Sequence, residues 1–326
     1  MSPAEPHGQN SGQPDWGTLL DALVAEHGSL ATLAQRLVEG GVDHDVTSAE
    51  RGLRRLRGRG PSPGGVWGER LLRTFGLPAE ISERLRFMGS YHSRFEDLPV
   101  SLAADLVGLW DRPPQRESRA GRVWLALAGA HLALRRRDPE AARRSLERAR
   151  SADSPDLRAR VEGALGLALL ESQAAPGEAP PSLSRVPDWL AELEGDDADC
   201  LRARYVGQLA WTAFRAGDLG GAERLFLGLP DQPDTHPFAA SRRANGLAYA
   251  LHRRGQAAEA LQFAQAAVRT AGDGGHVRLR AMGLLMVARV SPDEPERAEA
   301  RRRALRIGLA LEDAVLVHRA GGRLGK

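Results

Sequence analysis

The sequence predicts an all-α protein in which a small helical domain precedes a longer array of helical repeats. Leu, Ala and Arg dominate the composition, whereas aromatic residues make up 5% of the 326 residues and β-branched residues are sparse, which favours helix. The sequence pattern of one helical hairpin also occurs twice in the second half of the chain, and such repeats are typical of a solenoid. A chain of this length can form two domains with ample cores.

Charge and cysteine content narrow the possible functions. The formal net charge is +3 and nearly all basic residues are Arg, which we attribute mainly to a GC-rich coding sequence, so basicity alone says little about nucleic acid. The single cysteine, Cys200, excludes an internal disulfide and is expected to be a buried small residue. No signal peptide or apolar run of about 18 residues is present, so a cytoplasmic protein without a membrane partner is expected.

The N-terminal part begins with a polar tail and two short helices. Residues 1–14 are rich in Pro, Gly, Ser and Asn and are expected to be disordered. Apolar residues at helical spacing then predict a first helix over 15–27. Ser29 is the expected N-cap of a second helix over 30–38, which ends at Gly40-Gly41.

A basic third helix and a fourth helix follow. The third, SAERGLRRLRGRG, is expected to have Thr47 or Ser48 as its N-cap and to turn Leu53 and Leu56 toward the core. Its outward positions are Arg51, Arg54, Arg55 and Arg57. The fourth, GVWGERLLRTF, comes after a Pro-Gly break and closes with FGLP.

These four helices resemble the phage-repressor (Xre-type) helix-turn-helix family. LAQRL stands before the turn, LRRLRGRGPSPG after it, and FGLP matches the usual end of that family's fourth helix. The turn is longer than in that family, since 18 residues separate Ala34 from Leu53, and it carries Asp43 and Asp45, which would repel a phosphate backbone. The resemblance implies a four-helix, helix-turn-helix-like DNA-binding domain over residues 15–77.

In such a domain the third helix enters the major groove of DNA. Arg54 and Arg55 would then reach guanine edges, while residues beyond them would hold phosphates. The residues expected to contact DNA are Ser48, Arg51, Arg54, Arg55, Arg57, Arg59 and Ser62. Seven Arg stand against two Glu over 47–73, whereas 1–46 hold seven acidic residues and one Arg, so basic charge is concentrated on this helix. The alternative is a solvated basic helix in a domain that does not bind DNA.

Residues 78–120 are expected to form a helical connector. The pattern predicts a helix through Met88, an aromatic stretch around Tyr91 and a helix over 98–110 that stops at a Pro-Pro pair. His92 lies close to two carboxylates in the sequence, as in a metal site or an acid–base pair. No other His is near it in the sequence, so a satisfied interface histidine is expected.

The repeat array is expected over 121–326. VGQLAWTAFRAGDLGGAERLF and ANGLAYALHRRGQAAEALQFA align when Gly217 is matched with Gly255, 38 residues later, and a weaker copy lies near Arg137. The small residues of the first helix, the Gly-Asp turn and the Ala of the second resemble the tetratricopeptide repeat (TPR) family. The family period is about 34 residues, so extended loops are implied.

Two further stretches complete the array. AAPGEAPPSLSRVP interrupts the period and is expected to be a loop, either a tolerated insertion or a contact region for a partner. Residues 276–289 and 295–311 are expected to form a last hairpin. The ending, RRRALRIGLALEDAVLVHRAG, resembles a capping TPR helix that closes the core.

In TPR proteins the first helix of each hairpin lines an inner groove. Aligning the three copies places matched residues along that groove: His131, Trp211 and Tyr249 at one position, Arg135, Arg215 and Arg253 at another, and Arg204 and Arg242 as a third pair with Asn245 nearby. Aromatic rings beside guanidinium groups suit an extended peptide, because rings pack on side chains and guanidinium groups hold carboxylates or carbonyls. The alternative is ordinary packing between repeats with solvated Arg.

An Xre-type domain joined to TPR repeats resembles the peptide-sensing transcription regulators of bacteria. The resemblance implies a cytoplasmic homodimer whose DNA affinity responds to a peptide or protein partner in the groove. The competing hypothesis is a TPR adaptor that binds proteins and not DNA. No P-loop, dinucleotide-binding GxGxxG, HExxH or Gly-x-Ser-x-Gly motif is present, so no enzyme activity, catalytic residue, cofactor or metal is predicted.

Overall fold

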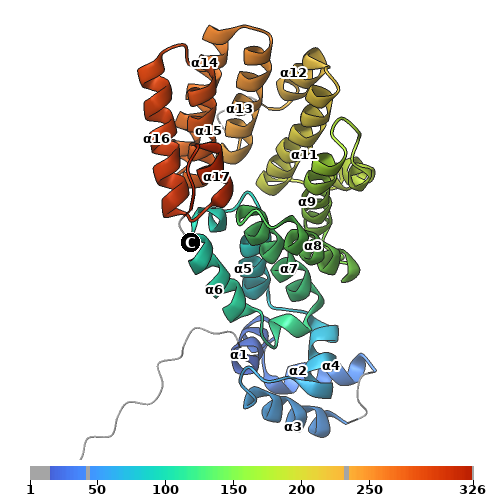
Figure 1. The fold of residues 1–326 in the computed structure, drawn as a ribbon. Coiled ribbons are helices and arrows are strands. Elements are labelled where there is room, and N and C mark those ends of the chain that lie inside the picture. Colours follow the sequence, from blue (N-terminus) through green and yellow to red (C-terminus); the bar gives the residue numbers. More distant parts are fainter. Residues whose placement is uncertain (1–14, 42–44, 231–234, 325–326) are drawn as a thin grey trace, which may run out of the picture. The chain divides into compact units, whose positions relative to one another are not determined.

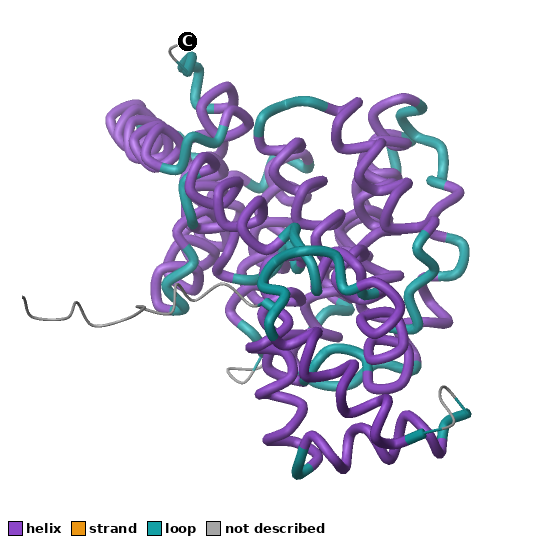
Figure 2. The backbone as a smooth tube through the Cα atoms, turned by 90° about the horizontal axis from the view of Figure 1, so that it is seen from below, coloured by secondary structure: helices purple, strands orange, loops and turns teal. Residues whose placement is uncertain are grey.

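The computed structural model describes residues 15–41, 45–230 and 235–324 (Figures 1 and 2). Within these ranges the regular elements are all helices and no strand occurs, so the predicted all-α fold class is confirmed. The expected disorder of residues 1–14, and the part of the expected turn that holds Asp43, lie outside the described residues.

The helices form two compact units. The N-terminal unit comprises the described part of Met1–Arg86 together with Asp105–Leu125, and the C-terminal unit comprises Phe87–Ala104 with the described part of Ala126–Lys326. The chain therefore enters the C-terminal unit, returns to the N-terminal unit and enters the C-terminal unit again. The predicted connector, residues 78–120, is divided between the two units.

Four short helices open the N-terminal unit: α1 (Trp16–His27), α2 (Leu30–Glu39), α3 (Val46–Arg57) and α4 (Gly65–Phe75). The predicted cap of α2 is confirmed, since the Ser29 hydroxyl accepts a hydrogen bond from the Thr32 N–H at 3.1 Å. The predicted cap of α3 at Thr47 or Ser48 was wrong. Asp45 is the N-cap, and its carboxylate accepts both of those N–H groups at 3.0 Å, so the helix starts at Val46 and not at or after Ser48.

Trp16 forms the centre of this unit. Its ring is fully buried, and its Nε1 donates a hydrogen bond to the Ser62 carbonyl at 2.8 Å. The ring lies so close to Gly64 and Gly68 that a Cβ at either position would come within 2.2 or 2.6 Å of it. Glycine at these two positions therefore lets α4 approach α1 closely. Helix α3 packs on α2, α1 and α4, and its Leu53 and Leu56 are buried.

Three helices and two short 3-10 turns follow α4: α5 (Ala79–Gly89), η1 (Arg94–Asp97), α6 (Val100–Trp110), η2 (Gln115–Glu117) and α7 (Arg119–Arg135). The two predicted connector helices are thus present, and the second begins directly after Pro99.

Stacked hairpins make up the rest of the C-terminal unit (Figure 1). After α7 these are α8 (Pro139–Ser151), α9 (Leu157–Ala174), η3 (Pro181–Leu183), α10 (Val186–Ala191), α11 (Asp196–Arg215), α12 (Leu219–Leu227), α13 (Pro237–Arg253), α14 (Ala257–Asp273), α15 (Val277–Val290), α16 (Glu294–Ala310) and α17 (Ala314–Arg319). The first helices of successive hairpins pack on each other, α9 on α11, α11 on α13 and α13 on α15, and we call these with α7 the inner helices. This stacking is compatible with the predicted solenoid.

The repeat alignment correctly predicted the hairpin turns. Gly217 and Gly255 both have positive φ, 86° and 82°, where a side chain would be strained. The aligned alanines of the two hairpins are fully buried, which lets the helices approach closely: Ala210, Ala222, Ala248 and Ala260. The predicted last hairpin is confirmed as α15 and α16.

The sequence predicted that the whole stretch AAPGEAPPSLSRVP is a loop. The structure shows a loop only in its first half. Its second half forms η3 and begins α10, and it buries Leu183 and Val186 in a cluster with Val161 and Leu165 of α9. Ser182 fixes it further by donating a hydrogen bond to the Ala164 carbonyl at 3.1 Å. The prediction was wrong for this half because its apolar residues are buried against α9.

Candidate functional site

The exposed face of α3 carries the arginines predicted to contact DNA. The opposite face packs into the N-terminal unit through Ala49, Gly52, Leu53 and Leu56, all of them buried. Arg51, Arg54, Arg55 and Arg57 point to solvent, and Arg59 follows just beyond the helix. Because the helical period separates the two sets, the arginines share one accessible basic face.

Two of these arginines pair with nearby carboxylates. Arg54 pairs with Glu50, one turn earlier on α3, and Arg57 pairs with Asp21 on α1. Exposed pairs of this kind contribute about 0–1 kcal/mol, so either guanidinium can exchange its carboxylate for a phosphate at little cost. The Arg55 side chain makes no hydrogen bond or ion pair with the residues that the structure describes.

The other predicted DNA contacts lie in the same stretch. Arg51 donates to the main-chain carbonyl one turn earlier at 3.3 Å, and Arg59 donates to the Pro63 carbonyl at 2.6 Å. Ser48 is half-buried at the start of α3, whereas Ser62 is exposed. All but Ser48 of the predicted residues are therefore exposed, and they follow one another along α3 and the turn after it.

The residues predicted for peptide binding do not form the expected rows. His131, Arg135 and Arg204 are buried, and the first two are each only 1% exposed. Trp211, in contrast, is 40% exposed. The expectation of one open aromatic row and one open arginine row along α7, α11 and α13 was therefore wrong. The physical reason is that another segment of the chain covers part of the inner helices.

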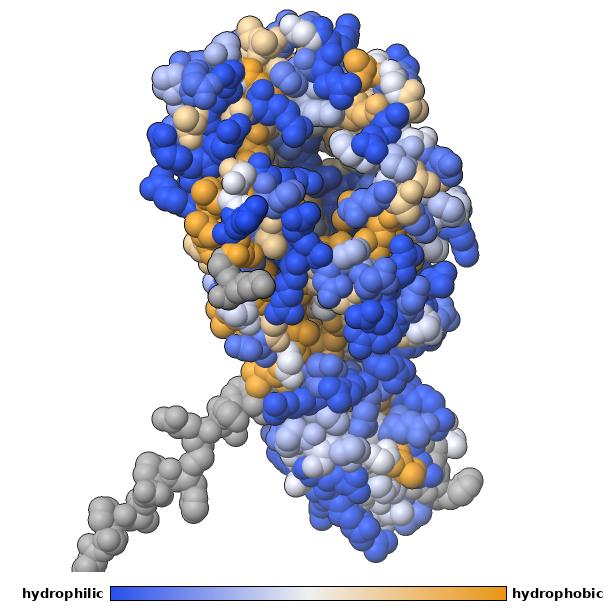
Figure 3. Space-filling view, viewed as in Figure 1, coloured by the Kyte–Doolittle hydropathy of each residue, from blue (hydrophilic) through white to orange (hydrophobic). Residues whose placement is uncertain are grey.

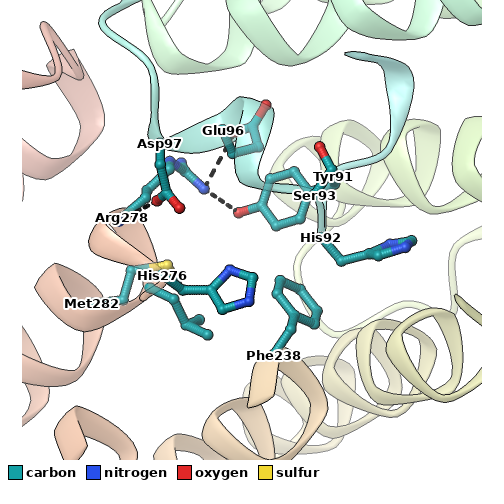
Figure 4. Close-up of a pocket in the computed structure, with 10 residues that line it drawn as sticks. Tyr91, His92, Ser93, Glu96, Asp97, Phe238, His276, Arg278 and Met282 are labelled. Carbon is teal, nitrogen blue, oxygen red and sulfur yellow. Dashed lines mark hydrogen bonds and ion pairs between the residues drawn. The ribbon is translucent and has the colours of Figure 1, made fainter. Parts of the chain in front are cut away.

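That covering segment is residues 90–98, which link α5 to α6. Tyr91 is its main anchor, and its ring lies between two guanidinium groups, with the Cζ of Arg204 at 4.5 Å and of Arg278 at 5.2 Å from the ring centroid. The Tyr91 hydroxyl accepts a hydrogen bond from Arg278 at 2.7 Å (Figure 4). The ring edge also meets His131 and Phe238, with centroids 5.5 and 6.2 Å apart.

Glu162 of α9 joins the covering segment to the inner helices. It pairs with Arg204, lies 3.1 Å from the His131 Nε2, and accepts the Tyr91 N–H at 3.3 Å. Burial by itself would raise the pKa of Glu162, but Arg204 and His131 outweigh it and lower the pKa to about 2. Glu162 is therefore ionised over the whole physiological range.

Asp313 holds the other end of this network. One carboxylate oxygen lies 2.7 Å from the Arg278 Nε and 3.2 Å from the Arg135 Nε, while the other accepts two N–H groups at the start of α17. Arg135 also donates to the Leu98 carbonyl at 2.8 Å and to the Leu311 carbonyl at 3.0 Å. Arg135 thus fastens the covering segment instead of facing a partner.

Three histidines that are distant in sequence lie near one another here. His92 pairs with Asp197 through its Nε2 at 2.8 Å, its ring centroid lies 6.4 Å from that of His236, and His236 lies 5.6 Å from His276. Burial is the main cause that lowers the pKa of His236 and of His276. Sequence reasoning missed this group because folding brings His92 of the covering segment close to His236 and His276, which are far from it in the sequence. No group of three His, Cys, Asp or Glu in the described ranges is arranged to hold a metal.

A small cavity lies beside the covering segment. Its volume is about 20 Å³, and its lining includes Tyr91, His92, Phe238, His276 and Arg278 (Figure 4). A space of this size holds about one water molecule, whereas sites for small organic ligands usually measure roughly 300 Å³ or more. The covering segment thus fills this end of the inner surface.

The remaining predicted residues lie on the open part of the inner surface. Arg215 stacks on Trp211, with its Cζ 5.7 Å from the ring centroid. Arg253 donates a hydrogen bond to the Tyr249 hydroxyl at 3.1 Å, and Tyr249 is half-buried. Arg242 and Asn245, also on α13, are half-buried. Figure 3 shows the surface hollowed between the helices labelled α13 and α11 in Figure 1.

Sequence reasoning missed two arginines beside this open part. Arg289 of α15 stacks on Tyr249, with its Cζ 5.4 Å from the ring centroid. Burial is the main cause that lowers the pKa of Arg319 of α17, and Arg278 and Arg289 lower it further. Neither arginine belongs to the three aligned hairpin copies, so the alignment gave no signal for them.

Comparison with known proteins finds no family model, curated protein or solved structure that matches this chain. The helix-turn-helix and TPR resemblances therefore stay predictions. Cys200 is buried, as predicted, and burial raises the pKa of its thiol. Among the helices that the structure describes, none has the length and apolar character needed to cross a membrane.

Proposed function

We propose that the protein is a bacterial transcription regulator that binds DNA through α3 and a partner through its C-terminal unit. The observation that carries the proposal is the basic face of α3, where Arg51, Arg54, Arg55 and Arg57 are exposed on a helix whose other face is buried. An exposed helix of this kind, packed on α2 and α1, has the form that enters a major groove.

The arginines of α3 divide into two kinds of contact in this proposal. Arg54 and Arg55 lie one after the other on the exposed face and are assigned to guanine edges, which offer two acceptors to one guanidinium. Arg57 and Arg59 lie at and beyond the helix end and are assigned to phosphates, which position the protein on any sequence. The exposed ion pairs of Arg54 with Glu50 and of Arg57 with Asp21 break when DNA binds.

The partner-binding role is assigned to the open part of the inner surface. Trp211, Arg215, Tyr249 and Arg253 supply two aromatic rings, each with a guanidinium group stacked on it. An extended peptide fits such a surface because rings pack against its side chains while guanidinium groups hold its carbonyls or carboxylates. His131, Arg135 and Arg204 are excluded from this role, since the covering segment already engages them.

The test measures binding of the full chain to a fluorescently labelled DNA duplex, using the fluorescence anisotropy of the duplex at a fixed salt concentration. We expect Arg54→Ala with Arg55→Ala to weaken binding by roughly 10-fold or more, given about 1–3 kcal/mol for each base-reading arginine. Arg144→Ala is the control, because Arg144 is an exposed arginine of α8 in the other unit. Equal affinity of the double variant and the wild type for DNA would refute the proposal that the protein is a regulator that binds DNA through α3. Capture of a protein partner by a chain that does not bind DNA would favour the adaptor instead.

A further inference from the structure

Histidines begin two neighbouring inner helices of the C-terminal unit. His236 is the N-cap of α13, and its Nδ1 accepts a hydrogen bond from the Phe238 N–H at 3.1 Å. His276 is the N-cap of α15, which packs on α13, and the two imidazole centroids lie 5.6 Å apart. Ser, Thr, Asp and Asn are the usual N-cap residues, so helix capping by itself does not account for this pair.

The hydrogen bond from Phe238 requires a neutral His236. A main-chain N–H can only donate, so the Nδ1 of His236 carries no proton, whereas an imidazolium donates at both nitrogens and accepts at neither. Protonation would therefore break the side-chain cap of α13 and place a positive charge at the positive end of the helix dipole. Protonated His276 would add a second such charge at the start of α15, next to the first.

Phe238 connects the cap of α13 to the covering segment. It is 4% exposed, and its ring centroid lies 6.2 Å from that of Tyr91 and 5.9 Å from that of His92. The His92 ring itself lies 6.4 Å from that of His236. Figure 4 shows the rings of Tyr91, Phe238 and His276 around the small cavity that these residues line. The first turn of α13 and the covering segment therefore share one buried contact beside the two caps.

Charged groups from α11 and from the covering segment act on the two capping histidines: Asp196, Asp197, Asp199, His92, Arg94 and Asp97. Asp197 already pairs with His92 at 2.8 Å. Asp97 pairs with Arg94 at 2.7 Å. Burial outweighs the carboxylates, so the pKa of both capping histidines falls below the ordinary value of 6.5. Both rings are therefore neutral at pH 7, as the cap of α13 requires.

We propose that His236 and His276 form a pH-sensitive lock on the covering segment, which stays closed while both rings are neutral and opens as they take up protons. In the open state the rings meet water and titrate near pH 6.5, so the closed state keeps its full stability above that pH and loses stability below it. Opening exposes Arg204 and His131, which Tyr91 contacts in the closed state. The lock goes beyond the proposed DNA and peptide contacts and depends on neither.

The test is hydrogen exchange of the full chain, measured by mass spectrometry on peptides that cover residues 90–98 at pH 7.5 and 5.5 and corrected for the intrinsic exchange rate at each pH. The wild-type opening equilibrium should rise by roughly tenfold from pH 7.5 to 5.5, because a histidine that is protonated only in the open state adds about that factor one unit below its ordinary pKa. Peptides from α16 should keep their protection, which shows that the opening is local. Glu162 is ionised at both pH values and cannot cause the change.

His236→Asn is the decisive variant, because Asn is a good N-cap that does not titrate. Combined with His276→Asn, it should keep the covering segment closed at pH 7.5 and remove the rise at pH 5.5, and each single variant should remove about half of the rise on a logarithmic scale. His318→Asn changes an exposed histidine of α17 and is the control, which should respond to pH as the wild type does. A wild type whose opening does not depend on pH, or single and double variants that keep the wild-type response, would overturn the proposal.

Discussion

Glu162 and Asp313 are the carboxylates on which the buried charges of the C-terminal unit depend. Each carboxylate contacts two basic side chains: Glu162 contacts Arg204 and His131, and Asp313 contacts Arg278 and Arg135. Removing one partner of a buried ion pair leaves an uncompensated charge and costs about 3–5 kcal/mol, whereas the intact pair adds little net stability. Loss of either carboxylate therefore leaves its buried arginine without a counter-charge.

The lowered pKa of Glu162 makes its contribution dependent on pH. Its pKa falls from 4.5 to about 2 on folding, so its charge stabilises the fold fully above pH 4.5 and loses this effect as the pH falls toward 2. We expect Glu162→Gln to lower the free energy of unfolding by about 3 kcal/mol at pH 7. The difference from wild type should shrink between pH 4.5 and 2, as measured by urea unfolding. A difference that stays constant over this range would contradict the assigned charge state.

At the scale of elements, α11 presents two aromatic residues to different surroundings. Trp211 is exposed, with Arg215 stacked on it, whereas Phe214 is buried against Tyr249, with ring centroids 4.8 Å apart. The helix therefore separates a residue that can bind a partner from one that holds α11 to α13. If the repeat alignment had assigned the wrong face of α11 to the inner surface, Trp211 would be the packing residue and Phe214 the exposed one.

Two substitutions on α11 test that division. We expect Trp211→Ala to keep helicity and near wild-type melting, because an exposed side chain loses little packing, while a central aromatic anchor commonly contributes about 2 kcal/mol or more to partner binding. Phe214→Ala is the matched variant and should lose about 3–5 kcal/mol of stability. Circular dichroism with thermal melting measures both. Severe destabilisation by Trp211→Ala would show that Trp211 belongs to the core.

At the scale of the whole molecule, the sequence predicted local features better than the inner surface. The order of the first helices, the Ser29 cap and the turns at Gly217 and Gly255 follow from nearby residues, and the structure contains them. The contact of Arg135 with Asp313 joins positions 178 residues apart, and no spacing in the sequence encodes it. The covering segment was missed for the same reason, since aligning repeats with one another cannot show what a segment outside them covers.

Assembly is a further property of the whole molecule. One helix-turn-helix unit contacts one half-site, and specific recognition usually needs two half-sites about 34 Å apart, so we predict a homodimer that binds a symmetric operator. Light scattering of the full chain at tens of micromolar should report twice the mass of one chain. With DNA added, the complex should still contain two protein chains. A single-chain mass with and without DNA would contradict the prediction.

The most direct measurement of the central claim is the salt dependence of DNA binding by the full chain. For the wild type, log affinity should fall linearly with log salt, with a slope of about −0.9 for each phosphate contacted. Arg59→Ala should weaken all sequences alike and flatten the slope by about one contact, whereas Arg54→Ala should reduce discrimination at one base pair. A wild-type slope near zero, or a slope and affinity that neither substitution changes, would contradict DNA binding through α3.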